Sequence, residues 1–217
     1  MVNFALAAAF LAVVLPPVMP TTHTTCYNYF LKKDGCVNSA NDPKIRCEPK
    51  PYSGGVPAFS MSGGSKTKRG VETTISLIKR YDTTQPSFFL ASGTGNCGYY
   101  DTNTQDGACL WSGPEQNNPT VESAGWLNSQ KTSNCHKELY IGLKEEGAAG
   151  TKYAPVLDGC SFGTTDPAVG CFQIGVTLQL FKKFNPTPAE NMAGKITRTI
   201  VWDFNSFKGE HTKNGPV

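Results

Sequence analysis

Short runs of strand-forming residues, bounded by turn residues, recur between residues 87 and 204. Residues 87–91 (SFFLA) alternate weakly and end in SGTG, and residues 153–157 lead into an Asp-Gly pair. Residues 139–143 (LYIGL) are rich in strand formers, and residues 196–204 (ITRTIVWDF) alternate polar and apolar side chains, most clearly over their first five positions. Alternation with a period of two is typical of strands with one buried face. We therefore predict strands in these four runs.

Apolar residues at helical spacing predict one short helix late in the chain. They lie between Gly175 and Pro186, and they are Val176, Leu178, Leu180, Phe181 and Phe184. Residues 121–126 suggest a second helical turn. Together with the strands, this pattern predicts a mainly β fold, a barrel with one or two short helices.

The first 20 residues have the pattern of a signal peptide. Residues 4–15 form an unbroken apolar run of 12, and three prolines follow before residue 21. Such a run is too short to span a bilayer and matches the core of a secretory signal. A buried N-terminal helix is the alternative, but no polar residue interrupts the run. We expect residues 1–20 to be removed and the chain to be secreted. No other apolar run approaches 18 residues, so no membrane association is expected.

The cysteine pattern agrees with secretion. The chain has eight cysteines, all after the leader: Cys26, Cys36, Cys47, Cys97, Cys109, Cys135, Cys160 and Cys171. An even number in a secreted chain predicts up to four disulfides. Structural zinc sites use closely spaced pairs, whereas the shortest spacing here is ten residues, so no metal is expected.

Composition and charge separate a basic arm from the rest of the chain. With 39% hydrophobic and 17% charged residues, the chain is expected to fold, and 22 glycines and 15 prolines favour short strands and turns. A net charge of +3 does not suggest a nucleic-acid binder. Residues 21–80 carry ten basic and four acidic residues, and residues 81–217 carry ten basic and thirteen acidic residues. We predict a basic Gly/Ser-rich arm (21–80), a folded domain (81–206) and a tail (207–217).

Two dibasic pairs, Lys68-Arg69 and Lys79-Arg80, lie near the end of the arm. Secretory proteases that cut after Lys-Arg would make the arm a pro-segment. A solvated basic loop is the alternative, and it is the interpretation we favour. Because the arm holds three cysteines, at least one must pair with the second part of the chain or stay free.

Five ordered landmarks carry a resemblance to a known family. Residues 92–99 (SGTGNCGY) resemble its GxGxCGY signature, and residues 123–126 (SAGW) followed by 134–137 (NCHK) resemble its (S/T)GW…CxK step. Residues 156–160 (VLDGC) are similar to its VVDxC, and Cys171 takes the place of the second cysteine of that loop. Residues 178–184 and 194–204 are similar to its ending, a short helix, a glycine and a final strand with tryptophan. The family is the double-psi β-barrel family of expansins, barwin, kiwellins and rare lipoprotein A-like proteins.

The resemblance implies a fold and a disulfide pattern. It implies a six-stranded double-psi β-barrel over residues 81–206. It also implies that Cys97 pairs with Cys135 and Cys160 with Cys171, which leaves Cys109 for the arm. The three arm cysteines then supply the partner of Cys109 and one internal pair. Gly95 and Gly98 are expected to allow a sharp turn at the end of the first barrel strand.

The carboxylates do not favour glycan hydrolysis, which normally needs an acid and a base or nucleophile facing each other. The resemblance places Gly175 where lytic relatives carry their acidic residue. Asp158 remains as a candidate groove carboxylate, with Asp166 as a weaker one, and a single carboxylate cannot take both roles. Asp158 either caps a turn or contacts a ligand. No motif for a cofactor occurs. Neither an enzyme activity nor a cofactor is predicted.

Aromatic residues are the candidate ligand contacts, because their rings stack on sugar faces. Together with Asp158, the candidates are Tyr99, Tyr100, Trp111 and Trp126, which lie near the loops that flank the family's groove. Tyr100 and Trp111 lie in polar stretches and are predicted to be exposed. For Trp126 a place in the core is the alternative, and for Trp202 it is the preferred interpretation.

Two functions follow from the resemblance. The first is a secreted, monomeric and non-lytic protein that binds a cell-wall polysaccharide (cellulose, chitin or pectin), as expansin-like and loosenin-like proteins do. The alternative is a protein-binding module, a kiwellin-like effector or defence protein. An aromatic groove open to solvent would favour the first. A groove blocked by the arm, or a flat apolar patch, would favour the second.

Overall fold

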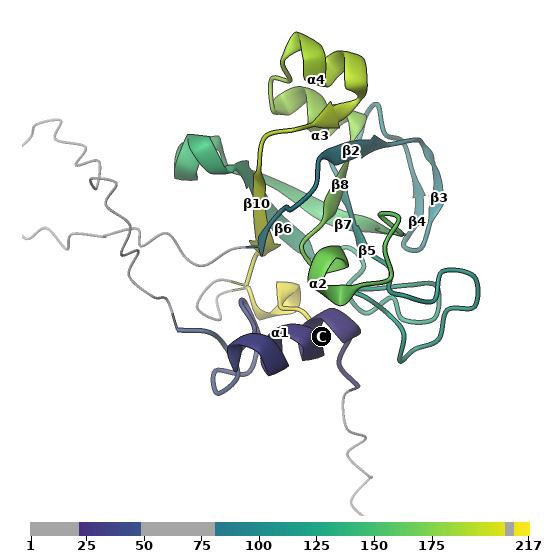
Figure 1. Ribbon diagram of the computed structural model, residues 1–217, viewed down its shortest axis with the longest axis vertical. Helices are drawn as coiled ribbons and strands as arrows, with labels where there is room; N and C mark the ends of the chain where they lie inside the picture. The colour runs from purple at the N-terminus through teal and green to yellow at the C-terminus, as the bar shows by residue number, and fades with distance from the viewer. Residues whose placement is uncertain (1–21, 49–80, 207–210) are drawn as a thin grey trace, which may run out of the picture.

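The computed structural model describes residues 22–48, 81–206 and 211–217 (Figure 1). The predicted leader and both dibasic pairs lie outside the described residues. The strands are β1 (Tyr81–Asp82), β2 (Ser87–Leu90), β3 (Gly93–Gly95), β4 (Gly98–Tyr100), β5 (Ala108–Trp111), β6 (Glu138–Leu143), β7 (Lys152–Cys160), β8 (Ile174–Thr177), β9 (Lys195–Ile196) and β10 (Ile200–Phe204). The predicted runs at 87–91, 139–143 and 153–157 are confirmed as strands.

Eight of these strands form one mixed sheet, in the order β1-β10-β6-β7-β5-β8-β2-β9. The sheet curls into a half-barrel, and β3 and β4 form a separate hairpin at its edge (Figure 1). Most neighbours are antiparallel, but β5 pairs in parallel with β7, and β2 pairs in parallel with β8. Parallel neighbours need long crossover connections, so strands far apart in sequence meet in the sheet.

The last predicted run is divided between two strands. Residues 197–199 leave the sheet between β9 and β10, although the alternation continues through them. The buried carboxylate of Glu190 accepts hydrogen bonds from the backbone N–H groups of Thr197 (2.8 Å) and Arg198 (3.3 Å). These N–H groups therefore donate to a buried carboxylate instead of to the carbonyls of a neighbouring strand.

The described helices are short: α1 (Thr25–Asp34), α2 (Pro167–Gly170), α3 (Leu178–Lys183), α4 (Pro188–Ala193) and two 3-10 segments, Lys144–Gly150 and Thr212–Asn214. The predicted helix after Gly175 is confirmed as α3, with Thr177 as its N-cap. Val176 belongs to β8 instead. Helices α2 and α4, which lie in the predicted domain, and α1 in the arm were not predicted. Among the described residues no helix is long and apolar enough to cross a bilayer.

The helical turn predicted over residues 121–126 is wrong. The carbonyls of Ala124 and Gly125 accept hydrogen bonds from Thr25 and Cys26 at the start of α1 (2.8 and 3.1 Å), and Trp126 donates its backbone N–H to Trp111 (2.7 Å). Long-range bonds thus take the backbone groups that a helix would need.

Large aromatic side chains form much of the core. Trp111, Trp126, Trp202 and Tyr81 are almost entirely inaccessible to solvent, and Phe30 of α1 packs among them. The core placement preferred for Trp202 is confirmed, as is the core alternative for Trp126. Each indole N–H donates to a backbone carbonyl, at 3.0 to 3.1 Å. Burial of these rings therefore leaves no indole donor unsatisfied.

All eight cysteines are paired. Cys97–Cys135 is confirmed, and the arm does contain one internal pair, Cys36–Cys47. The pairing of Cys160 with Cys171 is wrong, because Cys109 and Cys160 lie on the neighbouring parallel strands β5 and β7 and bond to each other. Cys171 instead receives Cys26 from α1. Four disulfides are typical of proteins that fold in an oxidising compartment.

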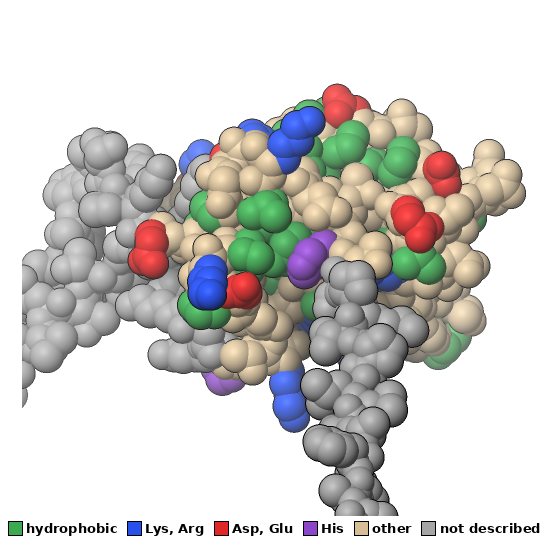
Figure 2. Space-filling model, turned by 90° about the horizontal axis from the view of Figure 1, so that it is seen from below, with side chains coloured by type: hydrophobic (Ala, Val, Ile, Leu, Met, Phe, Trp, Pro, Cys, Tyr) green, Lys and Arg blue, Asp and Glu red, His purple; other side chains and the backbone are tan. Residues whose placement is uncertain are grey.

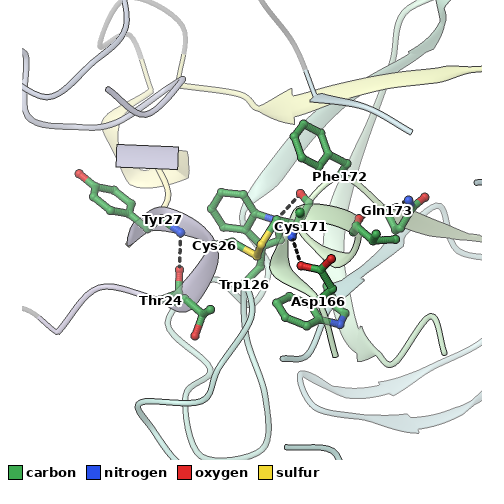
Figure 3. Close-up of a disulfide and its surroundings, with 12 residues drawn as sticks. Thr24, Cys26, Tyr27, Trp126, Asp166, Cys171, Phe172 and Gln173 are labelled. Atoms are coloured by element: carbon green, nitrogen blue, oxygen red, sulfur yellow. Dashed lines mark hydrogen bonds between the residues drawn. A yellow bond between two sulfur atoms is a disulfide. The ribbon is translucent and has the colours of Figure 1, made fainter. Parts of the chain in front are cut away.

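The described part of the arm shares the core of the sheet. Figure 3 shows the disulfide between Cys26 and Cys171 beside the ring of Trp126. Farther along the arm, the hydroxyl of Ser39 donates to the buried carboxylate of Asp203 in β10 (3.0 Å). The ring of Phe30, in α1, packs in the same hydrophobic core as the side chains of the sheet. Residues 22–48 are therefore held covalently, by hydrogen bonds and by burial.

Candidate functional site

Asp158, on β7, anchors the β3–β4 hairpin to the sheet. Its Oδ1 accepts hydrogen bonds from the backbone N–H groups of Asn96 (2.7 Å) and Gly159 (2.8 Å), and its Oδ2 accepts one from the hydroxyl of Tyr100 (3.2 Å). The carboxyl group is half-buried. Of the two roles expected for Asp158, the structure shows the capping of a turn.

The hairpin approaches Asp158 so closely that one residue must be glycine. A Cβ atom on Gly95 would lie 2.4 Å from the carboxyl carbon of Asp158. Gly98 has a φ of 108°, in the region that favours glycine. The disulfide of Cys97 and the bond from its N–H to the carbonyl of Leu157 (3.3 Å) complete the attachment. The expected sharp turn is present, and the hairpin is a fixed structure.

Tyr100 is part of this anchor and not of an exposed surface. Only 5% of the residue is accessible, so its predicted exposure is wrong. Burial, and the negative charge and hydrogen bond of Asp158, raise the pKa of its phenol to about 12. The side chain therefore stays protonated and continues to donate to Asp158 well above neutral pH.

The pKa of Tyr100 leads to a prediction about alkaline stability. Because the pKa in the folded state is above the value of 10.0 in the unfolded chain, Tyr100 contributes stability that is complete below pH 10 and is lost between pH 10 and 12. We expect Tyr100→Phe to make unfolding free energy fall less steeply in that range. Urea titrations at stepped pH measure this slope.

The control for that experiment is Tyr99→Phe, which removes a hydroxyl from the next residue of the same hairpin. The tyrosinate absorbance of the Tyr100→Phe protein should lose a component that titrates late, while the Tyr99→Phe protein should keep it. Equal alkaline slopes in the wild type and the Tyr100→Phe variant would contradict the assignment.

The other three predicted aromatic contacts differ in their exposure to solvent. Tyr99 is 74% exposed, whereas Trp111 and Trp126 are fully buried. The expected exposure of Trp111 is wrong. The polar run starts only at the next residue, and Trp111 itself is the last residue of β5, a strand that lies between β7 and β8 in the sheet. Gly170 of α2 covers its indole so closely that a Cβ atom there would lie 2.3 Å from the ring. Tyr99 alone of the four is available as a stacking surface.

The position of the family's acid is also inaccessible. Gly175 is buried in β8, opposite Cys109 of β5. A Cβ atom there would lie 2.7 Å from Cys109 Sγ, against the Cys109–Cys160 disulfide. Asp166, the weaker acid candidate, caps α2 by accepting the N–H of Ala168 (2.8 Å). Position 175 therefore has no room for a carboxylate side chain, and the carboxylate of Asp166 caps a helix.

A polar pocket opens beside the turn of the hairpin, and sequence reasoning did not find it. It has a volume of about 240 Å³ and is lined by Asn96, Ser112, Glu115, Gln116, Pro119, Asn128, Ser129 and Gly159. Gly159 follows Asp158, and a Cβ atom on it would lie 3.0 Å from the side chain of Ser112, so it leaves the floor open. The signal in the sequence is the polar run at residues 112–118, which directly follows Trp111.

The pocket is tied to the anchor of the hairpin through Asn96. In the amide orientation that satisfies both neighbours, Asn96 Nδ2 donates to Asp158 Oδ1 (2.8 Å), and its oxygen accepts the N–H of Ser129 (2.5 Å). Asp158 thus positions one wall of the pocket. In the described ranges no group of three or more His, Cys, Asp or Glu side chains could hold a metal ion.

No protein-family model matches the chain. No curated protein matches it either. Among solved structures, Streptomyces papain inhibitor aligns with 57% of this chain and 93% of its own length, at 20% sequence identity and a TM-score of 0.35. A similarity of this size carries no argument about fold or function.

Proposed function

We propose that this protein is a secreted, non-lytic protein that binds a cell-wall polysaccharide, as expansin-like proteins do. The observation that carries the proposal is an open polar pocket next to a fixed hairpin with an exposed aromatic ring. The pocket takes its walls from Asn96, Ser112 and Gln116, and Tyr99 lies three residues after Asn96 on the same hairpin. The proposed binding surface is therefore this pocket together with one ring, that of Tyr99, and not the four aromatic rings expected from the sequence.

The chemistry of the surface suits a sugar chain. The lining groups that keep hydrogen-bonding capacity, chiefly the carboxylate of Glu115 and the hydroxyl of Ser129, can bond to the hydroxyls of a saccharide. An exposed tyrosine ring buries the CH face of a sugar while its polar tip stays in water. The described residues that line the pocket all come from the sheet and its loops and none from the arm. The described part of the arm therefore does not line or block the pocket. A blocked site would have favoured the alternative function.

Binding without cleavage follows from the carboxylates. Both oxygens of Asp158 accept hydrogen bonds from the protein itself, at 2.7 to 3.2 Å, so this carboxylate is committed to holding the hairpin. Gly175 supplies no acid, and its surroundings have no room for one. Glu115 is then the only remaining carboxylate among the lining residues, and one carboxylate cannot serve as both acid and base or nucleophile.

The proposal includes the finer classification of the fold as a double-psi β-barrel. Two parallel pairings, β2 with β8 and β5 with β7, support it, because they interlock the first and second halves of the domain. The confirmed Cys97–Cys135 bond joins two of the landmarks on which the resemblance depends. Four disulfides support secretion.

The alternative, a protein-binding module, has less support. The large hydrophobic residues that are exposed are distributed over several elements: Phe89, Tyr99, Val121, Tyr153 and Met192. On the face at the α1 end, hydrophobic side chains appear in separate groups between polar ones (Figure 2). A protein interface usually has a more continuous apolar centre.

The proposal predicts that Tyr99→Ala weakens binding to an insoluble wall polysaccharide several-fold. One stacked ring contributes on the order of 1 kcal/mol, which is about fivefold in affinity. The measurement is a pull-down of the purified protein on cellulose, chitin and pectin, with the release of reducing sugar assayed in parallel. Tyr153→Ala is the matched control, because Tyr153 is also exposed (56%) but lies on β7 and not on the β3–β4 hairpin.

Two results would contradict this function. Release of soluble sugar that Asp158→Asn abolishes would show a lytic enzyme. Absence of binding to every wall fraction by a folded protein would favour the protein-binding alternative, and an equal loss with Tyr153→Ala would remove Tyr99 from the site.

A further inference from the structure

Glu115 differs from the other residues that line the polar pocket. It is the one lining residue with an ionisable side chain, and it is exposed. Within the described residues its carboxylate makes no hydrogen bond and no ion pair. An ionised carboxylate only accepts hydrogen bonds, with room for about four. The lining of the pocket therefore includes one exposed carboxylate to which no group of the described residues is bonded.

The remaining polar side chains are largely committed within the protein. The hydroxyl of Ser112 lies 2.8 Å from Gln116 Oε1 and 3.1 Å from the carbonyl of Cys160, and the amide nitrogen of Gln116 donates to the carbonyl of Gly113. These bonds use the oxygen of Gln116 and one hydrogen of its amide. Most of the hydrogen-bonding capacity of Ser112 and Gln116 is therefore used within the protein and is not available to a ligand.

The two asparagines are committed in the same way. Asn128 Oδ1 accepts the backbone N–H groups of Gln130 and Lys131 (both 2.9 Å), and its Nδ2 donates to the carbonyl of Thr120 (2.8 Å). The amide of Asn96 is held by Asp158, as described above. Besides the hydroxyl of Ser129, which can donate or accept, the group left for a ligand is therefore the carboxylate of Glu115, which needs a hydrogen-bond donor.

The charge around the pocket favours a positive donor. Asp158 lies directly behind Asn96, so a second carboxylate adds to the negative potential. Lys131, two residues after the lining residue Ser129, keeps its positive charge, but its Nζ is held by the carbonyl of Thr22 in the arm. Among the lining residues themselves the charge is that of Glu115 alone, so an ammonium group would be attracted there.

We propose that the polar pocket recognises glucosamine units with a free amino group, as in partially deacetylated chitin, and that Glu115 is the partner of the ammonium. An ammonium offers three donors and a positive charge, which complements the carboxylate better than a hydroxyl or an acetamide does. This inference rests on the proposed function, because it names the sugar class that the same surface selects.

The test compares soluble oligomers of equal length by isothermal calorimetry: glucosamine, N-acetylglucosamine, cello- and galacturonate oligomers, at a pH where the amine is protonated. We expect the glucosamine oligomer to bind best. Glu115→Gln should weaken that binding about two- to fivefold, which lies within the range of an exposed ion pair, and leave the N-acetylglucosamine oligomer unaffected. The preference should shrink at high salt.

Glu146→Gln is the matched control, since it removes one exposed carboxylate outside the pocket. An equal loss in both variants would indicate general attraction to a polycation and overturn the inference. Equal affinity for the amino and acetylated oligomers, or preference for galacturonate, would also overturn it while leaving glycan binding in place. Absence of binding to any of the oligomers and to every wall fraction would instead defeat the proposed function itself.

Discussion

Gly125→Ala is expected to destabilise the protein by about 3 kcal/mol, because two segments of backbone cross at this glycine. A Cβ atom on Gly125 would lie 2.2 Å from the carbonyl oxygen of Trp111 and 2.6 Å from the N–H nitrogen of Gly113. A side chain could rotate away, but backbone atoms at the end of β5 cannot move without breaking the bond from Trp126 N–H to Trp111 (2.7 Å). Chemical denaturation monitored by tryptophan fluorescence measures the loss.

Gly93→Ala is the control for this prediction. Gly93 lies in the β3–β4 hairpin, its φ is not positive, and a Cβ atom on it would meet no atom within 4 Å. An alanine there should be neutral or slightly stabilising, since it only reduces the freedom of the unfolded chain. Equal effects of the two substitutions would contradict the crossing of backbones at Gly125.

Removing the disulfide that ties the arm to the domain is the second large change. The double substitution Cys26→Ala and Cys171→Ala should cost about 4 kcal/mol, because the two residues are 145 positions apart and the open chain gains much freedom when unfolded. Other disulfides shorten the effective loop, which is why the value is not larger. Both cysteines are fully buried, so the native packing around Trp126 is loosened as well.

The matched control replaces the other arm disulfide, Cys36–Cys47, which spans only 11 positions. Its loss should cost about 3 kcal/mol or less in the same loop-closure picture. Urea denaturation of both variants gives the difference directly. A larger loss from the short loop than from the long one would show that residues 22–48 are not held mainly through Cys26 and Cys171.

Local patterns sufficed for β2, β6, β7 and α3. Residues 139–143 and 153–157 became β6 and β7 because alternation and β-branched or aromatic residues act within a few positions. The same applies to the cap of α3 at Thr177. Where a distant group intervened, the local pattern was misleading, as when the buried carboxylate of Glu190 drew residues 197 and 198 out of the sheet.

The disulfides show the same limit. An even number of cysteines predicted up to four disulfides, and the resemblance supplied Cys97–Cys135. It could not supply Cys109–Cys160, which depends on β5 and β7 being parallel neighbours. Cys171 was then free to receive Cys26 from α1.

The candidate site was decided almost entirely by tertiary structure. From its residues the sequence determined that Asp158 and Tyr99 lie near glycine-rich turns, because turn chemistry is local. It did not determine that Tyr100 and Trp111 are buried, because their cover comes from β7 and α2, which lie more than 50 residues further along the chain. The polar pocket exists only where the hairpin, the 112–119 loop and residues 128–129 meet. Which groups stay free for a ligand depends on the hydrogen bonds made where those segments come together, and no local pattern records them.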